Sequence, residues 1–398
     1  MASVVYITRD IERALGMEPR GDYYIITNTT PYSKEIKKRY RDNVYLIESR
    51  EILDTYDIMI LPEVEDIIVK HKAKIMVFKN TLHIEELCRE RGWEILNPNA
   101  KLSDLIENKI TQISWLGELS LFLPPYSISI IKDINWNNKP FILQWSHGHT
   151  GEGTILIQNE NDLENIKSKF LQREAKITDF IKGPVFTINI IISDKEILFG
   201  NISYQITGMM PFTENPFSTI GNDWSVPKTI LSQEQIERFH TMSKLIADKM
   251  RGGGWFGLFG IDIIHDEERD NFHILEINAR QTASVTYESE LQNKIRNNRA
   301  YGITVFEAHY KALMHEEIDK TVIEINDGAQ ILQRYKKNIN RINIEKIINS
   351  GYKVIEYANI KSNSDYLRIQ SEKGIMETHN KFNKRGKEIL DIISEKYE

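Results

Sequence analysis

The chain has 398 residues, of which 41% are hydrophobic and 27% are charged, and its formal net charge is −6. This length allows two or three domains with a large core, and the composition is that of an ordinary globular protein. The acidic balance provides no field that attracts nucleic acid or an anionic membrane, and the single cysteine, Cys88, excludes an internal disulfide and a cysteine-based zinc site.

The chain begins without a basic stretch followed by a long apolar run, so no signal peptide is expected. Its apolar runs are short and rich in β-branched residues, far below the roughly 18 residues that a membrane span needs. We therefore expect a cytoplasmic protein that binds neither membrane nor nucleic acid.

Short apolar runs alternate with charged stretches in residues 1–102. Strands are predicted at 3–8, 22–27, 44–47, 57–61 and 74–78, and helices at 32–40 and 83–92. This alternation predicts a parallel sheet of α/β type. No GxGxxG follows any of these strands, so a dinucleotide-binding reading lacks its main support.

A glycine-rich loop follows a predicted helix at 110–120. It joins predicted strands at 141–145 and 154–157, and its glycines are Gly148, Gly151 and Gly153. Glycine lets the backbone adopt positive φ and approach phosphate oxygens closely, so successive N–H groups can converge on an anion. The loop is therefore a candidate phosphate cover, with a plain hairpin turn as the alternative.

Three later segments carry polar groups in positions suited to a small ligand. A strand at 201–212 alternates polar and apolar residues, a loop at 221–227 is rich in polar groups, and a helix begins near 281 in a stretch rich in hydroxyls. The candidate substrate contacts in these segments are Ser203, Gln205, Asn222, Asp223 and Ser284.

The most informative segment is a predicted hairpin made of the runs 258–264 and 272–278. Glu276 and Asn278 point to one face because side chains in a strand alternate, and the hairpin can set Asp262 opposite them. Such oxygen ligands suit Mg²⁺ held against nucleotide phosphates, and two buried carboxylates repel each other without a cation. The alternative is a hairpin with one solvated carboxylate on each strand.

Arg280 lies two residues beyond Asn278 and is expected on the same side as the metal ligands. Its guanidinium offers a bidentate fork to a carboxylate or a phosphate. The alternative for this side chain is an ion pair with a nearby glutamate such as Glu288.

The order GxDxx…LEINxR, from Gly260 to Arg280, resembles the metal-binding hairpin of the ATP-grasp superfamily. The resemblance implies an α/β ATP-grasp fold with an N-terminal domain at 1–102 and an ATP-grasp domain at 103–318. Within the latter it implies a lid at about 103–177 and a core at about 178–318. Residues 319–398 are expected to form a small αβ extension.

The resemblance also implies roles for individual residues. Asp262, Glu276 and Asn278 would hold Mg²⁺, or Mn²⁺ in its place, and Arg280 would contact the transferred phosphate or the acyl phosphate. The implied nucleotide contacts are Lys109, Gln144, the loop glycines Gly148, Gly151 and Gly153, and the hinge residues Glu174, Asp179, Phe180 and Ile181. Gln144 stands where the family usually has a lysine, and Val185 stands where it usually has the ribose carboxylate.

The activity implied is that of an ADP-forming ligase, which joins a carboxylate to an amine through an acyl phosphate. ATP and Mg²⁺ would be required, the partners would be small molecules, and a homodimer is expected because dimers are common in the superfamily. Two alternatives stay open. One is a nucleotide-binding regulatory protein with degraded catalysis, supported by Gln144 and Val185, and the other is an enzyme resembling biotin carboxylase.

Overall fold

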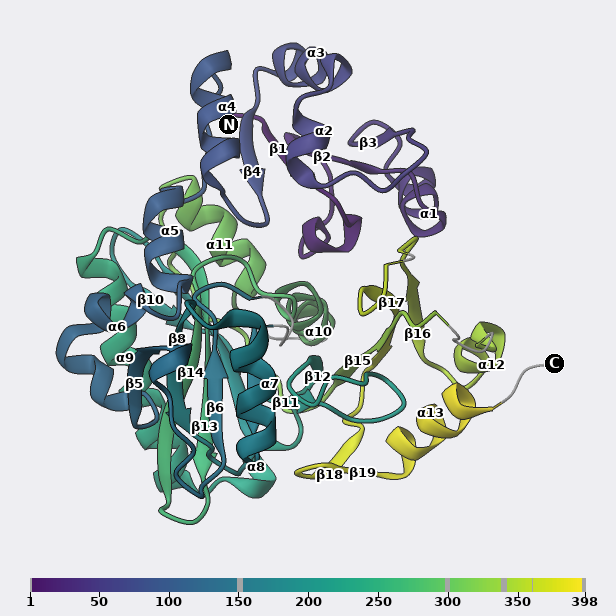
Figure 1. The fold of residues 1–398 in the computed structure, drawn as a ribbon. Helices are drawn as coiled ribbons and strands as arrows, with labels where there is room; N and C mark the ends of the chain where they lie inside the picture. Colours follow the sequence, from purple (N-terminus) through teal and green to yellow (C-terminus); the bar gives the residue numbers. More distant parts are fainter. Residues whose placement is uncertain (1, 149–152, 298–300, 338–341, 360, 396–398) are drawn as a thin grey trace.

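Four sheets with covering helices make up the chain in the computed structural model, which describes residues 2–148, 153–297, 301–337, 342–359 and 361–395. The sheets have four, four, nine and two strands, and the first is wholly parallel. The predicted α/β class is therefore confirmed. Figure 1 shows the N-terminal sheet at one end of the molecule and the C-terminal strands beside the central body.

The N-terminal sheet has the order β3-β2-β1-β4. Its strands are β1 Val4–Thr8, β2 Tyr23–Asn28, β3 Val44–Ile47 and β4 Lys74–Val77, and its helices are α1 Pro31–Arg39, α2 Thr55–Met59, α3 Pro62–His71 and α4 Leu82–Arg91. The strand order reverses between β1 and β4, so the loop after β1 opens onto a crevice of the kind that binds ligands in such sheets. A short 3-10 helix, Ile11–Ala14, begins in this loop.

The strand predicted at 57–61 is wrong, because most of this run lies in helix α2. A five-residue apolar run does not distinguish a strand from a short buried helix. Ile58 and Met59 are both fully buried on this helix, and Pro62 then occupies the first turn of α3, where its fixed φ is favourable.

A small antiparallel sheet has the order β5-β8-β6-β7, and the glycine-rich loop joins its strands β6 and β7. Its strands are β5 Tyr126–Ile130, β6 Phe141–Gln144, β7 Thr154–Ile157 and β8 Glu174–Asp179, and nearby helices are α5 Ala100–Glu107, α6 Thr111–Leu116 and α7 Glu160–Phe170. A Cβ built on Gly148 would lie 2.4 Å from Gly153 Cα, so the two arms of the loop approach too closely for any side chain there.

The central sheet has the order β14-β13-β9-β11-β12-β15-β17-β16, with β10 paired to β9. Its strands are β9 Val185–Ile192, β10 Ile197–Phe199, β11 Ser203–Thr207, β12 Thr219–Asp223, β13 Gly257–Asp266, β14 Asn271–Asn278, β15 Ala329–Arg334, β16 Lys353–Glu356 and β17 Asp365–Ser371. The largest core lies against this sheet and includes residues of the long helix α9, Gln233–Gly252. Ser232 and Gln235 form a capping box at the start of that helix.

The C-terminal residues extend the central sheet, as Figure 1 shows for β15, β16 and β17. The remaining elements are helices α8 Pro227–Ile230, α10 Val285–Asn297, α11 Val305–Leu313, α12 Ile344–Asn349 and α13 Lys384–Ser394, and strands β18 Met376–Thr378 and β19 Lys381–Phe382. No helix in the described residues is long and apolar enough to cross a membrane.

The loop predicted at 221–227 is partly wrong, because residues 221–223 belong to strand β12. Asn222 and Asp223 are buried there, and strand β12 pairs with β11 on one side and β15 on the other. Polar residues of this kind suggest a loop when the sequence is read alone. Some of their hydrogen-bond partners lie more than 100 residues away, at Gln330 and at residues 375–376.

Candidate nucleotide and metal site

The hairpin of β13 and β14 sets two carboxylates opposite each other. Asp262 pairs with Glu276 in the antiparallel register, and Gly260 pairs with Asn278. The register shifts beside Asp262, where Ile263 pairs with Ile274 and Leu275 is left as the extra residue of a bulge. Bulges re-aim side chains next to functional sites, and this one directly precedes Glu276.

Asp262 is held in place by neighbours from two strands. The Thr187 hydroxyl on β9 donates to Asp262 Oδ1 at 2.7 Å, and Asn278 Nδ2 donates to Oδ2 at 3.1 Å. Burial raises the pKa of Asp262 to about 6; the charge of Glu276 adds to this shift, and the hydrogen bonds oppose it. A cation bound beside Asp262 would therefore stabilise its ionised form.

Asn278 and Arg280 continue the same line of polar groups. Arg280 Nη1 donates to Asn278 Oδ1 at 2.6 Å and to Glu107 Oε1 at 2.8 Å. Lys79 also contacts Glu107. Arg280 therefore forms an ion pair with a nearby glutamate, as the alternative expected, but the partner is Glu107. Glu288, the partner suggested from the sequence, is fully buried elsewhere, where it accepts from Asn189 and Asn201.

Two buried lysines approach this hairpin from the small sheet and its preceding helices. Lys109 Nζ lies 3.0 Å from Glu276 Oε1, and Lys109 itself is 6% exposed. Lys176 on β8 is 1% exposed. Burial lowers the pKa of Lys176 to about 8; the charge of Lys109 adds to the shift and that of Glu276 opposes it. Both ammonium groups therefore share one electrostatic environment with the carboxylate pair.

The donor set fits a hard divalent cation. Two carboxylates and an amide supply oxygen atoms, the ligands that Mg²⁺ prefers when substrate phosphates and water complete its shell. In the described part of the chain no group of three or more His, Cys, Asp or Glu is arranged to hold a metal by itself. Ligation by Asn278 requires its carbonyl oxygen to exchange Arg280 for the cation.

The predicted nucleotide contacts of the small sheet lie around the same place. Gln144 ends β6 and faces Thr154 across the loop, with Gln144 Nε2 at 3.4 Å from Thr154 Oγ1. The backbone N–H of Lys109 donates to the carbonyl oxygen of Ser146 at 3.0 Å, so the lysine and the loop are fixed together. Gly148 and Gly153 are the arms of the loop, and Gly151 lies outside the described residues.

The hinge candidates Glu174, Asp179, Phe180 and Ile181 differ in their burial. Ile181 is buried and Phe180 is half-buried, as expected for side chains that flank a base, whereas Glu174 and Asp179 are both exposed at the two ends of β8. Gly183 has φ of 153°, and a Cβ there would lie 1.9 Å from the carbonyl oxygen of His265. This close approach explains why glycine follows the hinge.

Most candidate substrate contacts belong to one hydrogen-bonded network on the central sheet. Gln205 Nε2 donates to Thr187 Oγ1 at 2.6 Å, which links it to Asp262. Asn222 Nδ2 donates to Ser203 Oγ at 3.1 Å. These side chains are buried or nearly so, and they continue the polar surface away from the metal ligands.

Asp223 and Ser284 lie differently from the other candidates. Both carboxylate oxygens of Asp223 are filled by backbone N–H groups of Ser225, Ile375 and Met376, so Asp223 anchors the C-terminal hairpin and has no free lone pair aimed at a ligand site. The substrate role predicted for it has no geometric support. Ser284 is 3% exposed and contacts Asn189 and the Thr282 hydroxyl.

A cluster of four arginines was missed by the sequence reading. It lies where the loop after β1 meets β15 and β17, and its members are Arg9, Asp10, Glu12, Arg13, Arg334, Tyr357, Asp365 and Arg368. Asp365 contacts three of the guanidinium groups, and these hold the pKa of that carboxyl below its usual range although burial opposes the shift. No local motif announces the cluster, because its parts are about 350 residues apart.

The arginine cluster is joined to the hairpin site by hydrogen bonds. Arg368 Nη1 donates to Gln330 Oε1 at 3.0 Å, and Gln330 Nε2 donates to Asn222 Oδ1 at 3.3 Å. On the other side, Gln281 Nε2 donates to the carbonyl oxygen of Arg13 at 2.7 Å. Hydrogen-bonded polar side chains therefore connect the region of the metal ligands with the N-terminal sheet.

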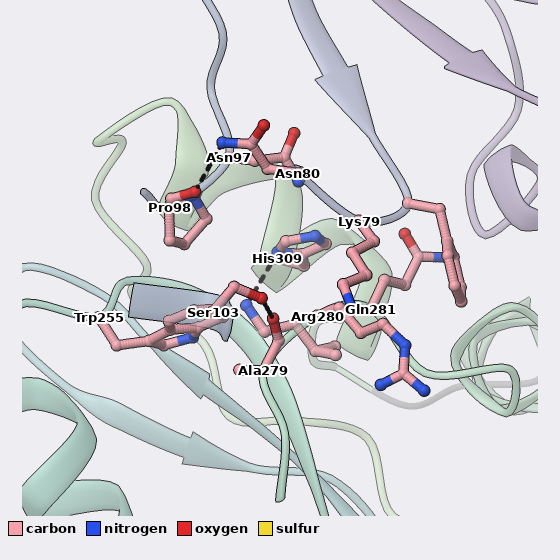
Figure 2. Close-up of a pocket in the computed structure, with 12 residues that line it drawn as sticks. Lys79, Asn80, Asn97, Pro98, Ser103, Trp255, Ala279, Arg280, Gln281 and His309 are labelled. Carbon is pink, nitrogen blue, oxygen red and sulfur yellow. Dashed lines mark hydrogen bonds between the residues drawn. The ribbon is translucent and has the colours of Figure 1, made fainter. Parts of the chain in front are cut away.

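A small cavity lies where the N-terminal sheet meets Arg280. Figure 2 shows Arg280 and Gln281 beside Lys79 and His309 around it, and its volume is about 10 Å³. That volume holds roughly one water molecule, so this junction has no room for a substrate in the described structure.

Residues 106–284 match a family model described as an ATP-grasp domain. This segment is therefore similar to ATP-grasp domains, and the predicted ATP-grasp fold is confirmed.

Two curated proteins are similar to the chain in sequence. One is the 2-oxoglutarate carboxylase small subunit of Hydrogenobacter thermophilus, 23% identical over 210 residues, which cover 50% of this chain and 43% of that protein. The other is the carbamoyl phosphate synthase large chain, C-terminal section, of Methanopyrus kandleri, 22% identical over 254 residues, covering 59% and 42% respectively. The chain thus spans less than half the length of these relatives.

Solved structures share the fold over almost the whole chain. The N5-carboxyaminoimidazole synthetase of Staphylococcus aureus, complexed with ADP, is 15% identical with a TM-score of 0.67 and coverage of 99% of this chain and 97% of that one. The biotin carboxylase domain of the H. thermophilus 2-oxoglutarate carboxylase, solved with MgADP and bicarbonate, is 15% identical with a TM-score of 0.65, covering 94% and 86%.

Proposed function

We propose that the chain is an ADP-forming ligase that joins a carboxylate to an amine through an acyl phosphate. The observation that carries the proposal is the facing pair Asp262 and Glu276, with Lys109 bonded to Glu276. Two carboxylates held this close favour a divalent cation, and lysines beside them favour a polyphosphate. Magnesium bound by Asp262, Glu276 and Asn278 would neutralise charge between the phosphates of ATP.

The residues of the chain divide the chemistry between them. Lys109 and the loop that includes Gly148 position the phosphates, so that a carboxylate oxygen of the substrate attacks the γ-phosphorus and the bond to ADP breaks. Arg280, next to Asn278, neutralises charge on the transferred phosphoryl group. The amine then attacks the acyl carbon, loses its proton, and phosphate leaves. Closure of the loop over the nucleotide would exclude water that hydrolyses the acyl phosphate.

The test is ADP release by the purified chain with Mg·ATP and a panel of carboxylates, with hydroxylamine as the amine. An acyl phosphate is trapped by hydroxylamine as a hydroxamate, so a carboxylate that stimulates both ADP release and hydroxamate formation supports the proposal. Glu276→Gln should lower both signals by roughly 100- to 1,000-fold. Glu268→Gln is the matched control, because Glu268 is exposed in the turn of the same hairpin.

Other outcomes identify the alternatives. ADP release that depends on bicarbonate, without any carboxylate, favours an enzyme resembling biotin carboxylase, in keeping with the bicarbonate found in the Hydrogenobacter domain. Tight binding of Mg·ADP without ATP turnover under any condition favours a nucleotide-binding regulatory protein. Either result contradicts the ligase proposal.

A further inference from the structure

Lys176 is a buried cation without a hydrogen-bonded or ion-paired side chain among the described residues. It lies in the middle of β8 and is 1% exposed. Burying an ammonium group away from water is costly unless an anion or hydrogen-bond acceptors compensate it. A side chain kept in such a position therefore suggests an anion that binds there.

The nearest charges do not resolve this imbalance. Lys176 interacts electrostatically with Lys109, which repels it, and with Glu276, which attracts it. Glu276 Oε1 already accepts from Lys109 at 3.0 Å. Two ammonium groups thus converge on a carboxylate that is itself a candidate metal ligand, and a cation bound to that carboxylate would increase the positive charge further.

The position of Lys176 relative to the glycine-rich loop indicates the kind of anion. In the small sheet Lys176 is the direct partner of Gln144, the last residue of β6 before the loop. Directly paired residues of antiparallel strands point to the same face of the sheet, with Cβ atoms about 5 Å apart. The two arms of the loop that follows Gln144 approach each other at Gly148 and Gly153, and backbone groups without a Cβ can approach a ligand closely.

We infer that Lys176 binds the phosphates of the nucleotide and supplies, from β8, the positive charge that β6 lacks at Gln144. The inference rests on the nucleotide site of the proposed function and does not depend on the carboxylate or the amine. A polyphosphate is the anion that lies at once against the carboxylate pair with its cation, the two lysines and the glycine loop. It relieves the repulsion between Lys109 and Lys176.

The experiment is titration calorimetry of the full chain with Mg·ADP, comparing the wild type with Lys176→Gln and with the exchange variant Gln144→Lys/Lys176→Gln. The single variant should bind Mg·ADP roughly 10- to 100-fold more weakly, because a hydrogen bond to a charged group is lost. The exchange variant should recover most of the affinity, since its ammonium enters the same space from the paired position. Lys182→Gln, at an exposed residue just beyond β8, should bind as the wild type does.

Two results would overturn the inference. One is unchanged affinity in Lys176→Gln, and the other is a loss of affinity that the exchange variant does not recover while both variants keep the wild-type circular dichroism spectrum. Lys176→Met adds a second readout, because a lysine needed only for packing would be replaced by methionine with no loss of Mg·ADP affinity. ADP binding needs no second substrate, so failure of the ligase assay leaves this test intact.

Discussion

The hairpin site and the arginine cluster both concentrate charge inside the protein, but they balance it differently. In the cluster, Asp365 touches Arg13, Arg334 and Arg368, and Tyr357 bridges Arg368 to Glu12. At the hairpin, two carboxylates face each other and Lys176 has no bonded partner among the described side chains. The carboxylates of the cluster are all paired with guanidinium groups, although Arg9 Nε, Arg13 Nη1 and Arg334 Nε have no hydrogen-bond partner among the described residues. At the hairpin we propose that a cation and an anion complete the balance of charge.

This difference distinguishes buried charges that stabilise the fold from buried charges that bind a ligand. Charges that satisfy one another hold elements together, here the N-terminal loop and the C-terminal strands. Charges left unbalanced at a fixed place destabilise the free protein and are typical of sites that bind charged ligands. Substitutions in the two regions should therefore act on different quantities.

The largest effect on stability is expected in the cluster. Arg368→Met removes a guanidinium that is 4% exposed and leaves Asp365 and Tyr357 without it, so the free energy of unfolding should fall by about 3–5 kcal/mol. Urea denaturation measures this. Arg39→Met, which breaks an exposed pair with Glu35, is the control and should cost less than about 1 kcal/mol. Equal losses in the two variants would contradict the structural role of the cluster.

The next largest effect is on turnover at the hairpin. Glu276→Gln keeps the size of the side chain but removes its charge, so ATP turnover should fall by roughly 100- to 1,000-fold, as when one preorganised charge-stabilising group is lost. Its free energy of unfolding should stay within about 1 kcal/mol of the wild type, since Glu276 is half-exposed. Steady-state ADP release and urea denaturation measure the two quantities. Wild-type turnover in this variant would remove Glu276 from the metal site.

A smaller effect of opposite sign is expected from Lys176→Met. The folded protein without nucleotide disfavours the charged lysine, and its pKa is lowered to about 8. Methionine should therefore raise the free energy of unfolding by about 1–3 kcal/mol at pH 7. Lys182→Met, at an exposed position, should change it by less than about 0.5 kcal/mol. Destabilisation by Lys176→Met would mean that the ammonium is satisfied in the folded protein.

An effect that appears only as the pH falls concerns the junction between the two regions, where His309 lines the cavity beside Arg280. Its Nδ1 accepts from the backbone N–H of Leu258 at 3.0 Å, and burial lowers its pKa to about 3. The unfolded chain binds the proton first, so this contribution to stability is present above the unfolded pKa of about 6.5 and is lost as pH falls toward 3. The slope is at most about 1.4 kcal/mol per pH unit.

His309→Asn keeps an acceptor for Leu258 but does not titrate. Between pH 6.5 and 4 its free energy of unfolding, measured by urea denaturation at several pH values, should fall less steeply than that of the wild type. Parallel pH profiles would show that other groups govern the acid sensitivity.

The hairpin could be predicted from local sequence patterns, whereas the arginine cluster could not. The register that sets Asp262 against Glu276 depends only on period-two alternation and a short turn, both readable in about twenty residues. The arginine cluster depends on contacts between the loop after β1 and strands β15 and β17, whose spacing in the sequence carries no signal. The same reason explains the error at 221–223, where distant partners turn polar residues into a buried strand.

Lys176 is an intermediate case, because only part of its surroundings could be predicted from the sequence. The sequence correctly marks Gln144 as an uncharged residue before the glycine loop, but the pairing of β6 with β8 is set by tertiary structure. In a short apolar run, hydrophobic periodicity does not distinguish a helix from a strand. At 57–61 the buried residues Ile58 and Met59 lie in a helix instead of the predicted strand. Strand pairing and short buried elements therefore need the structure.

The most direct measurement is the anomalous signal of Mn²⁺ in crystals of the chain grown with Mn²⁺ and a non-hydrolysable ATP analogue. The account predicts a manganese peak at roughly 2.1–2.2 Å from oxygens of Glu276 and Asp262 or Asn278, with the phosphates against Lys109 and Lys176. A peak located elsewhere, or a nucleotide bound away from this hairpin, would contradict it.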